Sequence, residues 1–359
     1  MKPSVNWLLV FIPIALAVEH LHASPPVVFF CAALAIVPIA ALIVRSTGQL
    51  ATYTGDAVGG LLNATFGNAP ELIIALVALH AGQLEMVRAS IIGAILANLL
   101  LALGIAFLIG GLKYHDQIYN RVAARTYASM MLLAAMSLAI PSAFSRVLAP
   151  EETVRSEALL NVGVAAALLA IYVLYLVFSL RTHKGSFASE GGDAGHGHGD
   201  GPRWSLPRAL ASLVVASLLA AWMSEVLVGA ADGTGKALGM SSVFIGIVFL
   251  AVVGGAAESG SAIAMGAKNK PDLSISIALG SSIQIALFIA PVLVFASYFI
   301  APAPLELSFS RAEVGTLFIG VMIGAMVYGD GQANWFKGVQ LITIYLIMAM
   351  MFYFMPGVT

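Results

Sequence analysis

Apolar stretches of about 20 residues recur along almost the whole chain, and they constrain its fold more than any other feature. The eleven stretches run approximately over residues 5–22, 26–45, 57–81, 87–111, 122–140, 157–181, 208–231, 240–267, 272–300, 312–328 and 336–355. An α-helix of about 20 apolar residues crosses the hydrocarbon core of a bilayer. We therefore expect an all-α polytopic membrane protein with about eleven transmembrane helices.

The composition supports a bilayer environment and excludes several other classes of protein. Only 10% of the 359 residues are charged and 60% are hydrophobic, whereas soluble domains carry about 25% charged residues. The net charge of −1 provides no basic face for a nucleic acid. The single cysteine, Cys31, excludes a disulfide framework or a cysteine-built metal site.

The first apolar stretch could be mistaken for a signal peptide. It is followed by Glu19, His20 and His22 rather than by small residues that would form a cleavage site. Another apolar stretch begins almost immediately. We interpret residues 1–24 as an additional N-terminal transmembrane helix.

The distribution of lysine and arginine predicts the orientation in the membrane. If the chain crosses eleven times, twelve of the 17 basic residues fall on the side of the N-terminus and five on the other side. Cytoplasmic loops are enriched in lysine and arginine. We therefore expect an integral protein of the cell (inner) membrane with a cytoplasmic N-terminus and an extracytoplasmic C-terminus.

A segment rich in glycine, histidine and acidic residues divides the chain. Residues 185–202 read GSFASEGGDAGHGHGDGP and offer almost nothing that could form a core. We assign residues 182–207 to a cytoplasmic linker. Its polar side chains, Glu190, Asp193, His196, His198 and Asp200, could bind a divalent cation loosely, but a solvated tether is the simpler interpretation.

The linker separates two similar halves, residues 25–181 and 208–359. Placing Glu71 over Glu258 also aligns Gly93 with Gly280, and Asn98 falls within one residue of Gln284. An offset of five spans inverts one half relative to the other. Two inverted five-helix repeats with interrupted helices are typical of secondary transporters.

Two glutamates, Glu71 and Glu258, lie within apolar stretches at matching positions of the two halves. A carboxylate at membrane depth costs a few kcal/mol, so it indicates a functional site. Helix-weakening residues surround both carboxylates and would free backbone carbonyl oxygens: Gly67, Pro70, Gly254, Gly255 and Gly260. Carboxylate and carbonyl oxygens are the ligands that hard cations prefer.

Other polar residues in these stretches have two possible roles. Asn68 and Glu71 fit a helix cap, although an uncharged residue would cap at lower cost in a membrane. Asn98, Ser281, Ser282 and Gln284 could ligate a cation or could only hydrogen-bond between helices.

At this point the sequence resembles a known family. The run GNAPEL at Gly67–Leu72, preceded by GGLLNATF, is similar to the first signature of the calcium/proton exchangers in the cation/Ca²⁺ exchanger superfamily. The second signature is similar around Glu258 and continues through Ile277–Val294, and the closing stretch YGDGQANWFKG also resembles this family. Family members usually have GNAAEH in the second half, whereas this chain has Gly255 in place of the asparagine and Ser259 in place of the histidine.

The resemblance implies one additional helix plus two inverted repeats that export Ca²⁺ in exchange for protons by alternating access. It implies no cofactor, with Ca²⁺ as the transported substrate. Two carboxylates that hold either Ca²⁺ or two protons are neutral in both states, so protons and Ca²⁺ would compete for Glu71 and Glu258.

Three other functions remain open. A Na⁺/Ca²⁺ or other monovalent cation exchanger is the nearest, but the sodium-coupled branch generally has hydroxyl-rich segments where this chain has Asn68 and Ala69. An intramembrane aspartyl protease could use Asp56 and Asp330, although Gly-Asp pairs at span edges are typical of turns. A passive cation channel would leave the inverted halves unexplained.

Overall fold

The computed structural model describes residues 5–54, 59, 61–62, 65–144, 154–183 and 203–355. These residues are helical almost throughout, so the expected all-α membrane class is confirmed. The helices are η1 (Val5–Val10), α1 (Phe11–His20), α2 (Pro25–Ala51), α4 (Ala69–His80), α5 (Leu84–Leu96), η2 (Ala97–Ala102), α6 (Leu103–Tyr114), α7 (Arg121–Ala143), α8 (Val154–Val177), η4 (Phe178–Thr182), α10 (Leu206–Leu238), α11 (Ser242–Phe244), η5 (Ile245–Leu250), α12 (Ala251–Gly254), α13 (Ala256–Ala267), α14 (Pro271–Gln284), η6 (Ile285–Ile289), α15 (Ala290–Ile300), α16 (Arg311–Tyr328) and α17 (Trp335–Phe354).

Among the described residues, eight helices are long and apolar enough to cross a membrane. They correspond to eight of the eleven predicted stretches. The predicted stretch 240–267 is a helix pair that is interrupted at Gly255, between α12 and α13. The predicted stretches 5–22 and 57–81 contain the shorter helices Val5–His20 and Ala69–His80.

Four short segments, η2, η4, η5 and η6, are π-helical turns inserted into or ending longer helices. A π-turn widens the helix by one residue and exposes a carbonyl group, and such turns are frequent at functional sites. Asn98 lies in η2, and Gln284 immediately precedes η6. The local backbone is therefore irregular at two of the predicted polar positions.

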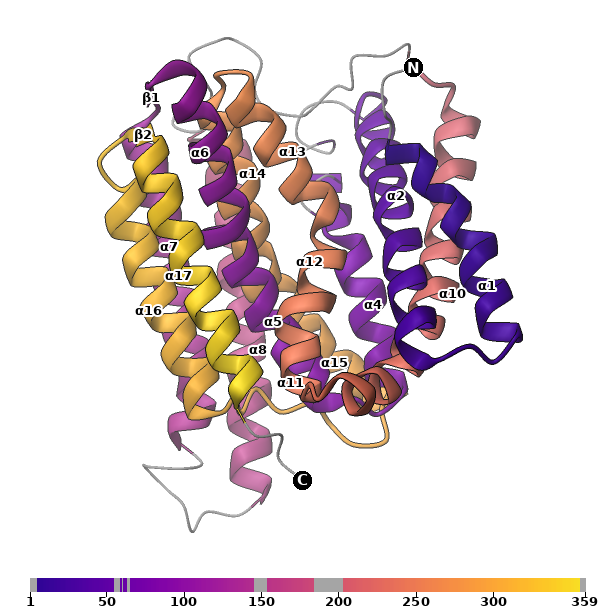
Figure 1. The fold of residues 1–359 in the computed structure, drawn as a ribbon. Helices are drawn as coiled ribbons and strands as arrows, with labels where there is room; N and C mark the ends of the chain where they lie inside the picture. Colours follow the sequence, from indigo (N-terminus) through magenta and orange to yellow (C-terminus); the bar gives the residue numbers. More distant parts are fainter. Residues whose placement is uncertain are drawn as a thin grey trace. The chain divides into compact units, whose positions relative to one another are not determined.

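The chain divides into two compact units, and each is described by itself. Unit 1 comprises residues 1–90, 196–257 and 351–359. In unit 1 the long helices α2 and α10 pack along each other, with α1 and α4 against them (Figure 1). The core between them is made of aliphatic and aromatic side chains such as Phe29, Ile36, Ile43, Met223 and Leu227.

Unit 2 comprises residues 91–195 and 258–350. In this unit α7 packs against α8, α14 and α16, and α14 also contacts η2 and α6. Two short strands, β1 (Asp116–Ile118) and β2 (Gln332–Asn334), pair antiparallel with Gln117 opposite Ala333. They join the loop after α6 to the loop before α17, as Figure 1 shows at one end of this unit.

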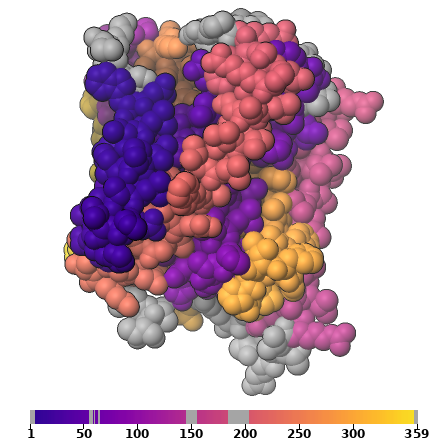
Figure 2. All heavy atoms as spheres, turned by 90° about the vertical axis from the view of Figure 1, so that its right-hand side faces the viewer, coloured from indigo at the N-terminus to yellow at the C-terminus, as the bar shows by residue number. Residues whose placement is uncertain are grey.

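Residues 184–202, which include the glycine- and histidine-rich segment, lie outside the described residues. The chain that follows is fixed in unit 1, because Trp204 is buried and α10 begins at Leu206. Figure 2 shows α10 in salmon beside the indigo N-terminal helix on the surface of this unit.

Candidate functional site

Glu71 lies in the first turn of α4 in unit 1. The turn at Gly67 and Asn68 precedes the helix, and Pro70 stands at its start, where the missing N–H of proline costs nothing. The side chain of Asn68 makes no capping bond to α4. Glu71 is only 8% exposed. The helix break predicted around Glu71 is thus a helix start, and its positive end favours a carboxylate.

The backbone of α12 passes close to this carboxylate. A Cβ atom added to Gly254 would lie 3.0 Å from Cγ and 3.4 Å from Cα of Glu71. Carbon atoms in contact normally lie about 3.5–4.0 Å apart. A larger residue at position 254 would press against Glu71, whose side chain would have to give by a few tenths of an ångström, so Gly254 also leaves room for the glutamate.

Glu258 lies in the first turn of α13 in unit 2. The helix before it ends at Gly254, Gly255 is not helical, and α13 starts at Ala256. Glu258 is 7% exposed. The predicted interruption at Gly255 is present, but Gly260 lies inside α13, which continues through it. Gly260 therefore does not interrupt the helix, because an isolated glycine lowers helix stability without ending the helix.

A chain of hydrogen bonds connects the residue after Glu258 to two other helices of unit 2. The Ser259 hydroxyl donates to Oδ1 of Asn98 at 3.2 Å, and Nδ2 of Asn98 donates to Oγ of Ser281 at 2.9 Å. Asn98 is 2% exposed and Ser281 6%. The structure thus brings together two of the predicted polar residues.

Ser259 was not among the predicted site residues. Its only signal in the sequence was its place directly after Glu258, where the resembling family has histidine. A hydroxyl at that place in α13 fits the bond to Asn98.

The remaining predicted polar residues, Ser282 and Gln284, are not part of this chain of hydrogen bonds. The Ser282 hydroxyl donates to the carbonyl of Ala278 in its own helix at 2.9 Å and approaches the carbonyl of Ile95 at 3.5 Å. This is the helix-bonding role that remained open for it. Gln284 is 6% exposed, and its buried Nε2 has no hydrogen-bond partner among the described residues.

Other carboxylates also lie within predicted spans. Glu225 on α10 is exposed, whereas Glu313 in the first turn of α16 is 4% exposed. Glu313 accepts from the backbone N–H of Ser310 at 2.7 Å in a capping box, so its burial has a local structural role. Among the described residues, no group of three or more His, Cys, Asp or Glu side chains could hold a metal ion.

Asp330 is not placed as a catalytic carboxylate. It lies in the loop before α17, its side chain is half exposed, at 52%, and it forms a 2.5 Å salt bridge with Nζ of Lys337 in the first turn of α17. Burial favours its neutral form, but hydrogen bonds from Lys337 and from the backbone N–H of Gln332 outweigh burial and lower the pKa of Asp330. Its proposed partner, Asp56, lies outside the described residues.

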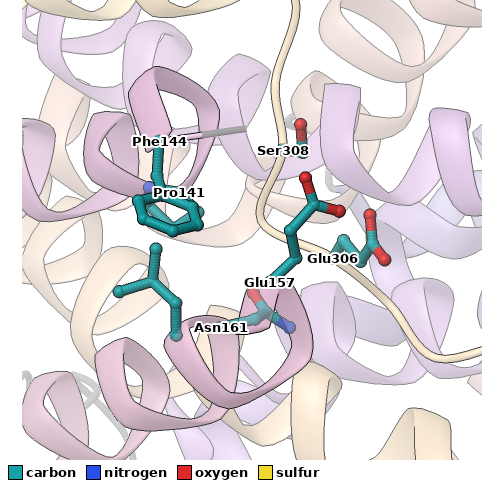
Figure 3. Close-up of a pocket in the computed structure, with 7 residues that line it drawn as sticks. Pro141, Phe144, Glu157, Asn161, Glu306 and Ser308 are labelled. Atoms are coloured by element: carbon teal, nitrogen blue, oxygen red, sulfur yellow. The ribbon is translucent and has the colours of Figure 1, made fainter. Parts of the chain in front are cut away.

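Unit 2 also contains a small pocket between α7, α8 and the loop before α16 (Figure 3). Glu157, Glu306 and Ser308 line it, and its free volume is about 10 Å³, enough for one water-sized group. Asn161 fixes the loop by donating to the carbonyl of Leu305 and accepting from the N–H of Leu307, both at 2.9 Å. The pocket thus lies beside a loop that Asn161 holds in place.

The profile of the sodium/calcium exchanger protein family matches residues 24–181 and 208–354. The Ca(2+)/H(+) antiporter of Aphanothece halophytica is 39% identical to this chain, and the alignment covers 98% of this chain and 96% of the relative. The Ca(2+)/H(+) antiporter ChaA of Bacillus subtilis is 37% identical, with 95% and 96% covered.

Solved structures resemble the chain over its whole length. The structure of native YfkE has a TM-score of 0.84 and 34% identity, and the match covers 98% of this chain and all of that one. The structure of the H+/Ca2+ exchanger CAX has a TM-score of 0.69 at 16% identity, covering 99% of this chain and 87% of that one. The second match shows a shared fold only.

Proposed function

Because the chain belongs to the sodium/calcium exchanger protein family, we propose that it is a Ca²⁺/H⁺ antiporter that exports Ca²⁺ from the cytoplasm. It would be a secondary active transporter that works by alternating access, and not an enzyme. The nearly full-length relatives named Ca(2+)/H(+) antiporters, at 37–39% identity, support this choice within the family.

The single observation that carries the proposal is a buried carboxylate at the start of a helix in each half of the chain. Glu71 begins α4 and Glu258 begins α13, at 8% and 7% exposure. We assign both as ligands for Ca²⁺ and for protons. A carboxylate buried within an apolar helical bundle is costly unless a cation or a proton neutralises it.

Exchange follows from competition for the same oxygens. Two carboxylates with one Ca²⁺ have no net charge, and two protonated carboxyls have none either, so both states can be occluded from water. The empty site with two negative charges would be costly to occlude. A bound divalent cation disfavours protonation of its ligands, so Ca²⁺ and protons replace each other.

The neighbouring polar residues have supporting roles. In this proposal Asn98 and Ser281 orient the segment that carries Glu258 through Ser259. Gly67, Asn68 and Pro70 set the start of α4, Gly254 leaves room for Glu71, and Gly255 starts α13. Gln284 has a buried amide available for a polar partner, while Ser282 is engaged with backbone carbonyls.

The finer architecture is also a proposal. We infer one additional N-terminal helix over residues 1–24, two inverted five-helix repeats over 25–181 and 208–359, and a linker over 182–207. The two segments matched by the family profile, 24–181 and 208–354, support this division. The excess of basic residues supports a cytoplasmic N-terminus and an extracytoplasmic C-terminus in the inner membrane.

Sodium coupling is the second candidate, because the family includes sodium/calcium exchangers by name. The first half has Asn68 and Ala69 between Gly67 and Pro70, so it lacks hydroxyl oxygens that a Na⁺ site could use. Proton coupling therefore fits the residues better. Addition of Na⁺ to the transport assay below discriminates the two.

The test is Ca²⁺ uptake driven by a pH gradient in inside-out vesicles. Glu71→Gln and Glu258→Gln keep the side-chain shape and remove the charge, and each should abolish uptake while the protein remains folded. Glu19→Gln is the matched control, because Glu19 is exposed at the end of α1. Near-normal uptake by either site variant would overturn the shared-site proposal.

A further inference from the structure

Three arginines gather in unit 1 where the chain enters α10. Arg203 and Arg208 flank the start of α10, and Arg45 lies near the end of α2, which packs against α10. All three are exposed. α2 and α10 are both long and apolar enough to cross a membrane, so we expect this cluster at the membrane–water boundary.

Trp204 organises the cluster. Its indole is 7% exposed, and the guanidinium carbons of Arg45 and Arg208 lie 5.0 and 4.8 Å from the centre of the same ring. The backbone N–H of Trp204 donates to Oε1 of Gln49 at 2.8 Å, and the Tyr53 hydroxyl donates to the Trp204 carbonyl. The ring is therefore fixed, and it holds two positive charges close together.

Arg203 adds a third positive charge. Its guanidinium lies 4.3 Å from the centre of the Tyr53 ring. Its Nε donates to Oγ1 of Thr52 at 3.1 Å, and its Nη2 donates to the Thr52 carbonyl at 2.5 Å. These bonds to the end of α2 order the side chain without neutralising it.

No described carboxylate neutralises the cluster. Among the described residues, none forms a salt bridge with Arg45, Arg203 or Arg208. A cation–π contact attracts a guanidinium to a ring but leaves its charge and its N–H donors available. Several arginines with free donors are the usual ligands of a phosphate group.

The surface next to the cluster is apolar. Val215, Leu218 and Trp222 follow Arg208 on α10 at spacings of seven, three and four residues and are 54%, 67% and 51% exposed. Residues at these spacings share one face of a helix. Figure 2 shows α10 on the surface of unit 1, in salmon. A stripe of exposed apolar side chains on the face that carries Arg208 matches the two parts of a phospholipid.

We propose that Arg45, Arg203 and Arg208 bind the phosphate headgroup of an anionic phospholipid, whose acyl chains lie along Val215, Leu218 and Trp222. The lysine and arginine count assigns this site to the cytoplasmic leaflet, whose anionic lipids attract basic clusters. Trp204 acts as the platform that holds two of the arginines in place. The site is independent of the proposed ion exchange.

The test measures lipid binding to the purified full-length protein by native mass spectrometry. Wild-type protein should bind phosphatidylglycerol more tightly than phosphatidylcholine. The double variant R45Q/R208Q should bind phosphatidylglycerol roughly tenfold more weakly, since each basic residue near an anionic surface contributes to affinity, with phosphatidylcholine binding unchanged. The control R125Q/R181Q removes two exposed arginines elsewhere on the same predicted side and should bind as wild type does.

Three results would overturn the proposal. The first is equal affinity of the wild-type protein for the two lipids, which needs no variant to fold. The second is unchanged phosphatidylglycerol binding by a folded R45Q/R208Q variant. The third is equally tight binding of water-soluble glycerol phosphate, which would mean that the cluster binds free phosphates and not a lipid.

Discussion

Substitution of Gly254 by alanine tests how the backbone of α12 sets the position of Glu71. The added Cβ would lie 3.0 Å from Cγ of Glu71 and 3.6 Å from Cδ1 of Ile74. Because carbon contacts prefer about 3.5–4.0 Å, the glutamate side chain or α12 must give by a few tenths of an ångström. Such overpacking typically costs about 1–3 kcal/mol, partly offset by up to about 1 kcal/mol of helix propensity gained from alanine.

We expect this displacement to weaken Ca²⁺ transport more than it weakens folding. If about 1.4 kcal/mol of the strain falls on the bound state, the Ca²⁺ concentration for half-maximal transport rises about tenfold. The assay is Ca²⁺ uptake into proteoliposomes at a fixed pH gradient, with thermal unfolding measured in detergent on the same preparations. Gly254→Val should be more severe.

Gly229→Ala is the matched control for this prediction. Gly229 lies on α10 in the same unit, and an added Cβ there meets no atom within 4 Å. It should transport as the wild type does. Wild-type Ca²⁺ dependence in the Gly254→Ala protein would refute the inferred approach of α12 to Glu71.

Three further substitutions test other contacts. Asn98→Ala removes both hydrogen bonds that connect Ser259 to Ser281 and should shift the pH dependence of Ca²⁺ uptake. An unchanged pH profile would mean that Asn98 contributes only to helix packing. Asp330→Asn removes the salt bridge to Lys337. The free energy of unfolding at pH 7 should fall by at most about 1 kcal/mol, since Asp330 is half exposed. Because the folded pKa is lowered, this stabilisation exists above the unfolded pKa near 4 and disappears as pH falls through the folded pKa, so the unfolding temperatures of variant and wild type should converge in acid. Asn161→Ala leaves two buried backbone groups unpaired and should lower the free energy of unfolding by about 2–5 kcal/mol. The variant should unfold at a lower temperature, while the protease sensitivity of the other loops should not change.

The sequence predicted the start of α4 well because the signal there is local. Pro70 at the start of a helix, a preceding Gly67 and an acidic Glu71 in the first turn all act within a few residues of one another. The interruption at Gly255 was predictable for the same reason. Gly260 gives a weaker signal, because a single glycine can lie within a helix that tertiary packing maintains.

Contacts between distant segments could not be predicted in the same way. Ser259 and Asn98 are separated by 161 positions, and a serine hydroxyl in a helix can equally bond to its own backbone, as Ser282 does. The arginine cluster was not predicted, because Arg203 and Trp204 fall within residues 182–207, which the sequence assigned to a linker. The association of Trp204 with α2 depends on contacts with Arg45 and Gln49, which lie more than 150 positions earlier in the sequence.

The central claim is that Ca²⁺ and protons compete for Glu71 and Glu258. The most direct measurement adds Ca²⁺ to the purified protein in weakly buffered detergent solution and records the protons released. The wild-type protein and Glu19→Gln should release protons on Ca²⁺ binding, and their Ca²⁺ affinity should fall as pH is lowered. Glu71→Gln and Glu258→Gln should show neither effect. Proton release of wild-type size from a folded variant of either glutamate would contradict the account.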